Sequence, residues 1–114
     1  GTNPDRTYPT PEGLHPGAGS ILAALEAATD QKPIIAGKPL PAMMEMAMER
    51  MKTSKNETLV VGDRLETDIV GGYNAGCRTC LVLSGVSTRE QLNFSDVKPD
   101  YIANDLADLI GITT

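Results

Sequence analysis

The sequence predicts an α/β fold in which helices cover a parallel sheet. Short apolar runs alternate along the chain with segments of helical periodicity. The central run, Leu59-Val60-Val61, is apolar at every position, which is typical of a strand buried on both faces. It ends at Gly62-Asp63, and a helical pattern begins near Glu66. Such alternation implies right-handed crossovers between strands that run in the same direction.

Composition limits the classes of protein that fit. The 114 residues carry a net charge of −5, so no basic stripe is available to neutralise a nucleic acid. No segment approaches the roughly 18 apolar residues of a membrane span, and we expect no membrane partner. With 40% hydrophobic residues and no Trp, the core must be mainly aliphatic. Two cysteines do not make a disulfide framework, which favours a reducing, cytoplasmic setting.

The first third of the chain is predicted to hold a loop, a helix and a strand. It starts at Gly1 without an initiating Met, which suggests a piece of a longer protein. Residues 1–17 hold four prolines and are expected to lack regular structure. Residues 16–20 then open a helix with apolar residues at helical spacing, which is expected to end near Thr29-Asp30. Residues 33–36, Pro-Ile-Ile-Ala, are expected to form a short strand that ends before Lys38.

Two helices flank the central strand. Pro41 suits the first turn of a helix that runs to about Lys52 and contains all five methionines. Met44, Met48 and Met51 fall on one face, which favours a flexible buried surface over a soft-metal or partner site. The helix after Asp63 is expected to close at Gly76, a common C-cap residue.

The last third continues the alternation. Residues 79–83 read as a strand, residues 88–92 as a short helix, residues 101–103 as a further strand and residues 104–111 as a last helix. The sequence thus predicts four parallel strands in all, counting the one at residues 33–36.

The acidic residues after the central strand are the first candidate site. In open α/β sheets, ligands bind beyond the carboxyl ends of the strands, where Asp63 is placed. Asp68 follows near the start of the next helix. Two carboxylates here suit Mg²⁺, which prefers oxygen ligands and usually takes one or two carboxylates with water and phosphate. The alternatives are that Asp63 is a turn residue and that Asp68 is an acid favoured by the helix dipole.

Other polar residues give weaker signals. Lys38, at the end of a second predicted strand, could hold a phosphate or neutralise a crowded carboxylate site. Cys77 and Cys80 form a CxxC with no further ligand nearby, so buried free thiols are favoured over zinc. His15 lies in the proline-rich loop. The glycines at 17 and 19 could cradle an anion at a helix start, but they lack the full phosphate-loop pattern.

Several of these motifs resemble a known family in order and spacing. Residues 62–69, Gly-Asp-Arg-Leu-Glu-Thr-Asp-Ile, preceded by Gly37-Lys38-Pro39, are similar to the last two motifs of the haloacid dehalogenase (HAD) superfamily. Thr2-Asn3-Pro4-Asp5, residues 16–19 and residues 83–87 match its NagD-type branch, which includes nitrophenylphosphatases, pyridoxal phosphatases and phosphoglycolate phosphatases. The resemblance covers essentially the whole chain.

The resemblance implies a HAD-like Rossmannoid sheet and a magnesium-dependent phosphomonoester hydrolase acting on a small phosphorylated metabolite. Residues 1–32 would be the end of a cap domain, and residues 33–114 the C-terminal part of the core. Lys38 would steady the catalytic nucleophile and the phosphate. Asp63 would bind Mg²⁺, and Asp68 would support the metal and its waters. Asn3, Asp5 and His15 are weaker candidates for substrate contact.

The sequence departs from this family in one large respect. The family's nucleophile and its acid/base are two Asp residues separated by one position, and no two Asp residues here are so spaced. We therefore expect both on a missing N-terminal part of the same protein, and no hydrolysis by this chain alone. The alternative is a non-catalytic α/β module that binds a partner or forms a homo-oligomer. A receiver-like or flavodoxin-like domain is a weaker option.

Overall fold

The computed structural model describes residues 1–113, with side chains placed as far as Gly111. It divides into two compact units, Gly1–Gly37 and the chain from Lys38 onward. Each unit is a separate body and is described on its own. No helix among the described residues has the length and apolar character needed to cross a bilayer.

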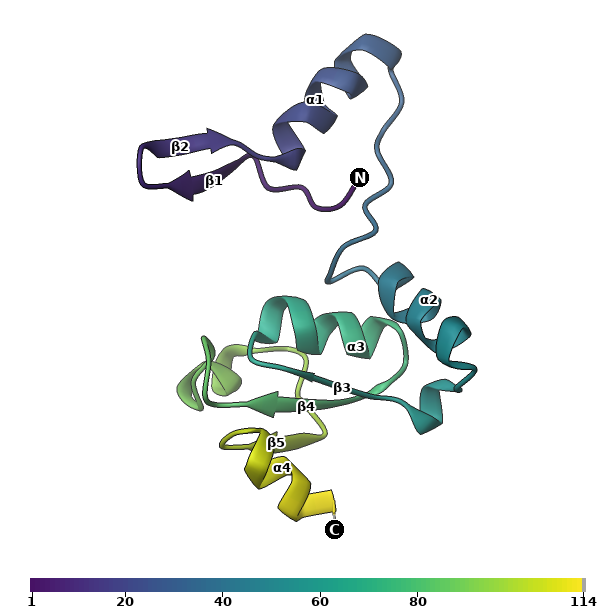
Figure 1. The fold of residues 1–114 in the computed structure, drawn as a ribbon, viewed down its shortest axis with the longest axis vertical. Coiled ribbons are helices and arrows are strands. Elements are labelled where there is room, and N and C mark those ends of the chain that lie inside the picture. The colour runs from purple at the N-terminus through teal and green to yellow at the C-terminus, as the bar shows by residue number, and fades with distance from the viewer. Residues whose placement is uncertain (114) are drawn as a thin grey trace. The chain divides into compact units, whose positions relative to one another are not determined.

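The second unit is built on a parallel sheet. Its strands β3 (Leu59–Gly62), β4 (Arg78–Val82) and β5 (Tyr101–Ala103) lie in the order β3-β4-β5, as Figure 1 shows. Both pairs are parallel, with Val61 opposite Cys80 and Leu81 opposite Ile102. The predicted α/β class is therefore confirmed, and the carboxyl ends of all three strands meet at one edge.

The sheet buries apolar side chains on both faces. On one face, Cys80 and Val82 pack with Ala103 and with Leu109 of helix α4 (Leu106–Thr113). On the other, a second cluster forms around β4 and the helical segment after β3; its members are Leu65, Ile69 and Leu81. Figure 1 shows α3 (Val70–Asn74) and α4 on opposite sides of the sheet. Alternate residues of β4 thus pack into two layers, which explains why Cys80, Leu81 and Val82 are apolar in succession.

The helices of this unit follow the predicted order with differences in type. Helix α2 (Ala42–Met51) lies within the predicted bounds, but it buries no side chain and Met51 is exposed, so the expected buried methionine face is wrong in part. The helix after Asp63 begins as a π-helix, η2 (Leu65–Ile69), and continues as α3. The short helices η1 (Lys55–Glu57) and η3 (Glu90–Phe94) are 3-10 helices.

The first unit contains a hairpin that the sequence did not predict. Strands β1 (Thr7–Thr10) and β2 (Gly13–Pro16) pair antiparallel. The prolines did not prevent this, because both strands of a two-stranded sheet are edges, where a missing N–H is tolerated. Gly13 turns the chain with a φ of 125°, a backbone conformation that favours glycine. Helix α1 (Ala18–Thr29) follows, close to the predicted bounds.

The predicted strand at residues 33–36 is absent. The N-terminal amine of Gly1 donates to the Ile34 carbonyl at 2.7 Å, and the Ala36 N–H donates to the Gly1 carbonyl at 2.8 Å. The segment thus lies beside Gly1 rather than in a sheet, and the Ile34 side chain is 85% exposed. An apolar run predicts a strand only where a neighbour pairs with it, and among the described residues this segment has no strand neighbour.

Candidate functional site at the carboxyl edge of the sheet

Asp63 lies directly beyond the carboxyl end of β3, where the sequence predicted it. Its Oδ2 accepts a hydrogen bond from the Val86 N–H at 2.8 Å, and its main-chain carbonyl accepts one from the Ser87 N–H at 2.9 Å. Residues 83–87 follow the carboxyl end of β4, the neighbouring parallel strand. Two strand ends therefore hold this carboxylate between them.

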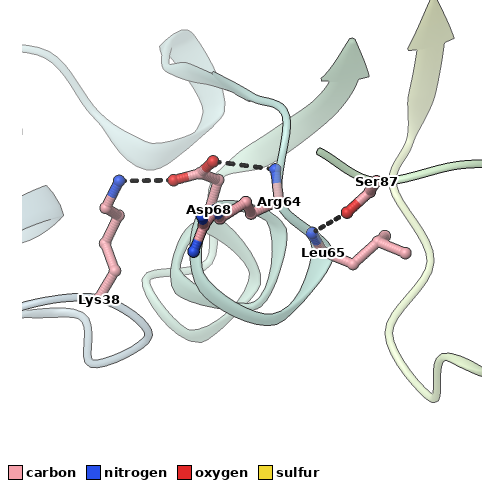
Figure 2. A network of polar contacts seen from close by, with 5 residues as sticks. All are labelled: Lys38, Arg64, Leu65, Asp68 and Ser87. Atoms are coloured by element: carbon pink, nitrogen blue, oxygen red, sulfur yellow. Dashed lines mark hydrogen bonds and ion pairs between the residues drawn. The ribbon is translucent and has the colours of Figure 1, made fainter. Parts of the chain in front are cut away.

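Asp68 projects from η2 toward the same edge. One carboxylate oxygen accepts from the Lys38 Nζ at 2.5 Å and the other from the Arg64 N–H at 3.1 Å, as Figure 2 shows. The Asp68 side chain is 11% exposed, whereas the Lys38 side chain is 41% exposed, so solvent screens this ion pair in part.

Gly62 gives Asp68 the space it occupies. A Cβ at position 62 would lie 2.2 Å from the Asp68 Cβ and 2.4 Å from its Cγ. The two residues at the end of β3 thus contribute in different ways. Gly62 leaves space for the Asp68 carboxylate, and Asp63 supplies the second carboxylate.

Lys38, Asp63 and Asp68 therefore form one connected group. Lys38 bonds Asp68, and Asp68 bonds the backbone of Arg64, the residue that follows Asp63. The other three candidates, Asn3, Asp5 and His15, lie in the first unit. There the Asn3 side chain accepts from the Asp5 N–H at 3.0 Å, and the His15 ring lies edge-on to Tyr8 with centroids 5.8 Å apart.

The glycines at the start of α1, Gly17 and Gly19, do not present free amides to an anion. The Gly17 N–H donates to the Arg6 carbonyl at 2.8 Å, and the Gly19 N–H donates to the Asp5 carbonyl at 2.7 Å. A Cβ at either position would collide with those backbone segments. These glycines permit a close approach between two stretches of backbone.

The two cysteines are buried free thiols, as predicted. Burial raises the pKa of both the Cys77 and the Cys80 thiol. The Cys77 Sγ lies 3.6 Å from the Met48 Sδ of α2. Among the described residues, no three His, Cys, Asp or Glu side chains group as a metal site.

The donor set at the sheet edge fits a hard divalent cation in part. Asp63 and Asp68 offer carboxylate oxygens, the ligands that Mg²⁺ prefers, and two carboxylates are as many as this ion usually takes from a protein. Asp63 has one oxygen for which the described residues provide no hydrogen bond, whereas both Asp68 oxygens are engaged. Asp63 is thus the better direct ligand, and Asp68 is suited to holding Lys38 and the turn around Asp63.

Residues 85–87 were missed as contributors to this site. The segment Leu83 to Ser87 matches a family motif in the sequence, but the motif alone indicates no role for it. The Val86 and Ser87 amides donate hydrogen bonds to Asp63. The Ser87 hydroxyl accepts a hydrogen bond from the Leu65 N–H (Figure 2). Because these contacts join residues more than twenty positions apart, only the parallel pairing of β3 and β4 could have predicted them.

Comparisons with known proteins agree with this arrangement. A family model described as HAD-hydrolase-like matches residues 35–109. The chain is 40% identical over 108 residues to a dihydroxyacetone phosphatase of Corynebacterium glutamicum, covering 95% of this chain and 39% of the relative. It is 37% identical over 108 residues to the ribonucleotide monophosphatase NagD of Escherichia coli K12, covering 95% and 42%.

A solved structure matches as well. The p-nitrophenyl phosphatase of Archaeoglobus fulgidus superposes with a TM-score of 0.78 at 37% identity, over 96% of this chain and 44% of that one. The chain thus spans about two fifths of the length of these relatives. The matched motifs, the parallel sheet and these similarities together show that the chain belongs to the HAD superfamily, in its NagD-type branch.

Proposed function

We propose that this chain supplies the lysine and the cation-binding acid of a magnesium-dependent phosphatase that hydrolyses a small phosphorylated metabolite through an aspartyl-phosphate. The observation that supports this proposal most directly is the grouping of Lys38, Asp63 and Asp68 at the carboxyl edge of the sheet. The phosphatase names of the relatives support this class of reaction, although they differ in the substrate they name.

Each residue of the group has a distinct role in this proposal. Asp63 provides the carboxylate ligand to the cation, and Asp68 orients the Lys38 ammonium through their 2.5 Å contact. Lys38 places positive charge beside a phosphoryl group and its attacking carboxylate, which lowers the cost of bringing two anions together. A bound Mg²⁺ would add further neutralisation of the phosphoryl oxygens.

The covalent step requires residues that this sequence does not contain. A carboxylate oxygen forms a bond to phosphorus while the ester P–O bond breaks, and a nearby acid protonates the departing alcohol. Water then attacks the aspartyl-phosphate, releasing inorganic phosphate and the free carboxylate. Because no two Asp residues here stand two positions apart, we place the nucleophile and the acid in a preceding part of the protein, which is then this chain's main partner.

The remaining expectations stay proposals. We assign residues 1–32 to the end of a cap domain, with Asn3, Asp5 and His15 as candidate substrate contacts, and residues 33–114 to the core. The two free thiols are consistent with a cytoplasmic setting.

A chimera tests this function. The part of E. coli NagD that precedes its matched C-terminal region is joined to this chain, and turnover of p-nitrophenyl phosphate is measured with and without Mg²⁺. We expect Mg²⁺-dependent turnover by the chimera, none by this chain alone, and loss of turnover in the Asp63→Asn and Lys38→Met chimeras. Turnover by this chain alone, or a folded chimera whose turnover survives Asp63→Asn, would contradict the proposal.

A second candidate function rests on a different observation. Within the described part of the chain, β3 has a strand neighbour on one side only, and Val61 on that strand is exposed. An unpaired strand edge is a template for pairing with another chain, which favours a self-associating module. Sedimentation equilibrium distinguishes the two: mass that rises with concentration supports self-association, and a constant monomer mass at high concentration contradicts it.

A further inference from the structure

The segment Gly85-Val86-Ser87 binds the turn around Asp63 at several points. Besides the two amide contacts to Asp63, the Ser87 hydroxyl accepts from the Leu65 N–H at 3.0 Å, as Figure 2 shows. Leu65 begins η2, the helix that carries Asp68. One short segment thus contacts the strand end that carries Asp63 and the helix that carries Asp68.

The contact with the Asp63 carboxylate is one-sided. The Val86 N–H donates to Oδ2 at 2.8 Å, while no described backbone or side-chain group donates a hydrogen bond to Oδ1. A carboxylate held in this way has a fixed rotation and one oxygen left for another ligand. Outer contacts of this kind orient metal-binding carboxylates and affect their affinity.

Gly85 makes the close approach to Asp63 sterically allowed. A Cβ at position 85 would lie 2.1 Å from the Asp63 Oδ2, 2.4 Å from its Cβ and 2.5 Å from its Cγ. Any larger residue must therefore displace the carboxylate or the segment. The requirement is one of space, because no positive φ is recorded for Gly85.

Ser87 fixes the other end of the segment. It is 2% exposed, and the Leu65 N–H that it accepts belongs to a residue that is 3% exposed. Water cannot readily replace this bond, so the hydroxyl defines where η2 begins relative to β4.

We infer that Gly85, Val86 and Ser87 are positioning residues that hold the Asp63 carboxylate in the rotation needed to bind a divalent cation. This inference rests on the proposed function, in which Asp63 is the cation ligand. Neither Gly85 nor Ser87 touches the cation or the substrate; each acts through Asp63 or through η2.

Binding of Mn²⁺ to the 114-residue chain tests the inference without relying on catalysis. Water-proton relaxation enhancement reports bound Mn²⁺ even at a weak site. We expect Asp63→Asn to abolish this binding and Gly85→Ala to weaken it by about 10- to 100-fold. The matched control is Gly111→Ala, because a Cβ there meets no atom of the described residues within 4 Å. This variant should bind Mn²⁺ as the unaltered chain does. Circular dichroism checks that each variant is folded.

The outcomes separate the positioning role from the proposed function. If Asp63→Asn abolishes binding but folded Gly85→Ala binds normally, the positioning role is wrong and the cation role of Asp63 stands. If binding is absent, or survives in Asp63→Asn, both are wrong.

Amide hydrogen exchange provides a second test that also covers variants with altered folding. In the unaltered chain the Val86 N–H should be protected by Asp63, and Asp63→Ala should remove that protection while leaving the amides of β5 unchanged. Ser87→Ala should expose the Leu65 amide and weaken Mn²⁺ binding, whereas Ser87→Thr, which keeps the hydroxyl, should restore both. Unprotected Val86 in the unaltered chain, or normal Mn²⁺ binding in Ser87→Ala, would overturn the inference.

Discussion

Lys38 and Asp68 show how much of the site depends on single contacts. Their sequence positions are thirty apart, yet their side chains meet at 2.5 Å. The sequence predicted that Lys38 would hold a phosphate or relieve a crowded carboxylate site. It did not predict that Asp68, rather than Asp63, would be its partner, because the choice depends on where η2 begins and on the space left at Gly62.

Replacing Lys38 should lower stability only slightly. Lys38→Met removes the partner of Asp68, but the lysine side chain is partly solvated, so we expect a loss of about 1 kcal/mol in the free energy of unfolding. Urea unfolding measures it, with Lys32→Met at an exposed position as the control. A loss several times larger would contradict this estimate, because it would show that solvent does not weaken the ion pair between Lys38 and Asp68.

Ser87→Ala should lower the free energy of unfolding more than Ser84→Ala, a substitution at an exposed position nearby. The change leaves the buried Leu65 N–H without its acceptor, so we expect a loss of about 1–3 kcal/mol. Ser84 lies on the same segment but is exposed, and Ser84→Ala should change stability by less than about 0.5 kcal/mol. Equal losses in urea unfolding would show that the Ser87 hydroxyl contributes nothing beyond the surface average.

Among the elements, β4 matters most for the core. It is the central strand, and its alternate residues enter the two apolar clusters on opposite faces of the sheet. The apolar runs at β3, β4 and β5 predicted these strands well, because each strand pairs with a neighbour. Burial is most complete in β4, whereas Val61 on β3 is exposed, so the expected burial of the run Leu59-Val60-Val61 on both faces is wrong at Val61. The same pattern failed at residues 33–36, where no strand pairs with the segment, and proline content failed at the β1–β2 hairpin.

The strand β4 offers a direct test of core packing. Leu81 is 0% exposed, so Leu81→Ala should remove about 2–5 kcal/mol from the free energy of unfolding. Val61→Ala on β3 is the matched control, since Val61 is exposed and should cost much less. If the two variants unfold at the same urea concentration, the described packing around β4 is wrong.

The thiols before and within β4 predict a dependence on alkaline pH. Burial raises their pKa above the ordinary thiol value of 9.0, so above that pH the folded state binds more protons than the unfolded state. Their contribution to stability should be constant below pH 9.0 and fall as the pH rises beyond it. The double variant Cys77→Ala, Cys80→Ala isolates the effect, because it keeps every other titrating group. A loss of stability between pH 9 and 10 that is identical in both chains would contradict this prediction.

At the scale of the whole molecule, the chain consists of two units that the sequence predicted to different degrees. The parallel sheet of the second unit was predicted, and the hairpin of the first was not. Residue motifs predicted the fold class and the carboxyl edge of the sheet as the candidate site. They could not predict the contacts of residues 85–87, which depend on strand register. In the proposed function, the reaction also requires a nucleophile and an acid, which we place in a preceding part of the protein.

NMR of the ¹⁵N-labelled chain during titration with Mg²⁺, and then with inorganic phosphate, shows where the cation and the anion bind. We expect Mg²⁺ to shift the amide signals of residues 62–68 and 84–87, and phosphate to shift those around Lys38. The shifts caused by Mg²⁺ should be lost in Asp63→Asn, and the shifts caused by phosphate should be lost in Lys38→Met. Shifts that arise elsewhere in the chain, or that persist unchanged in these variants, would contradict a cation and phosphoryl site at this edge of the sheet.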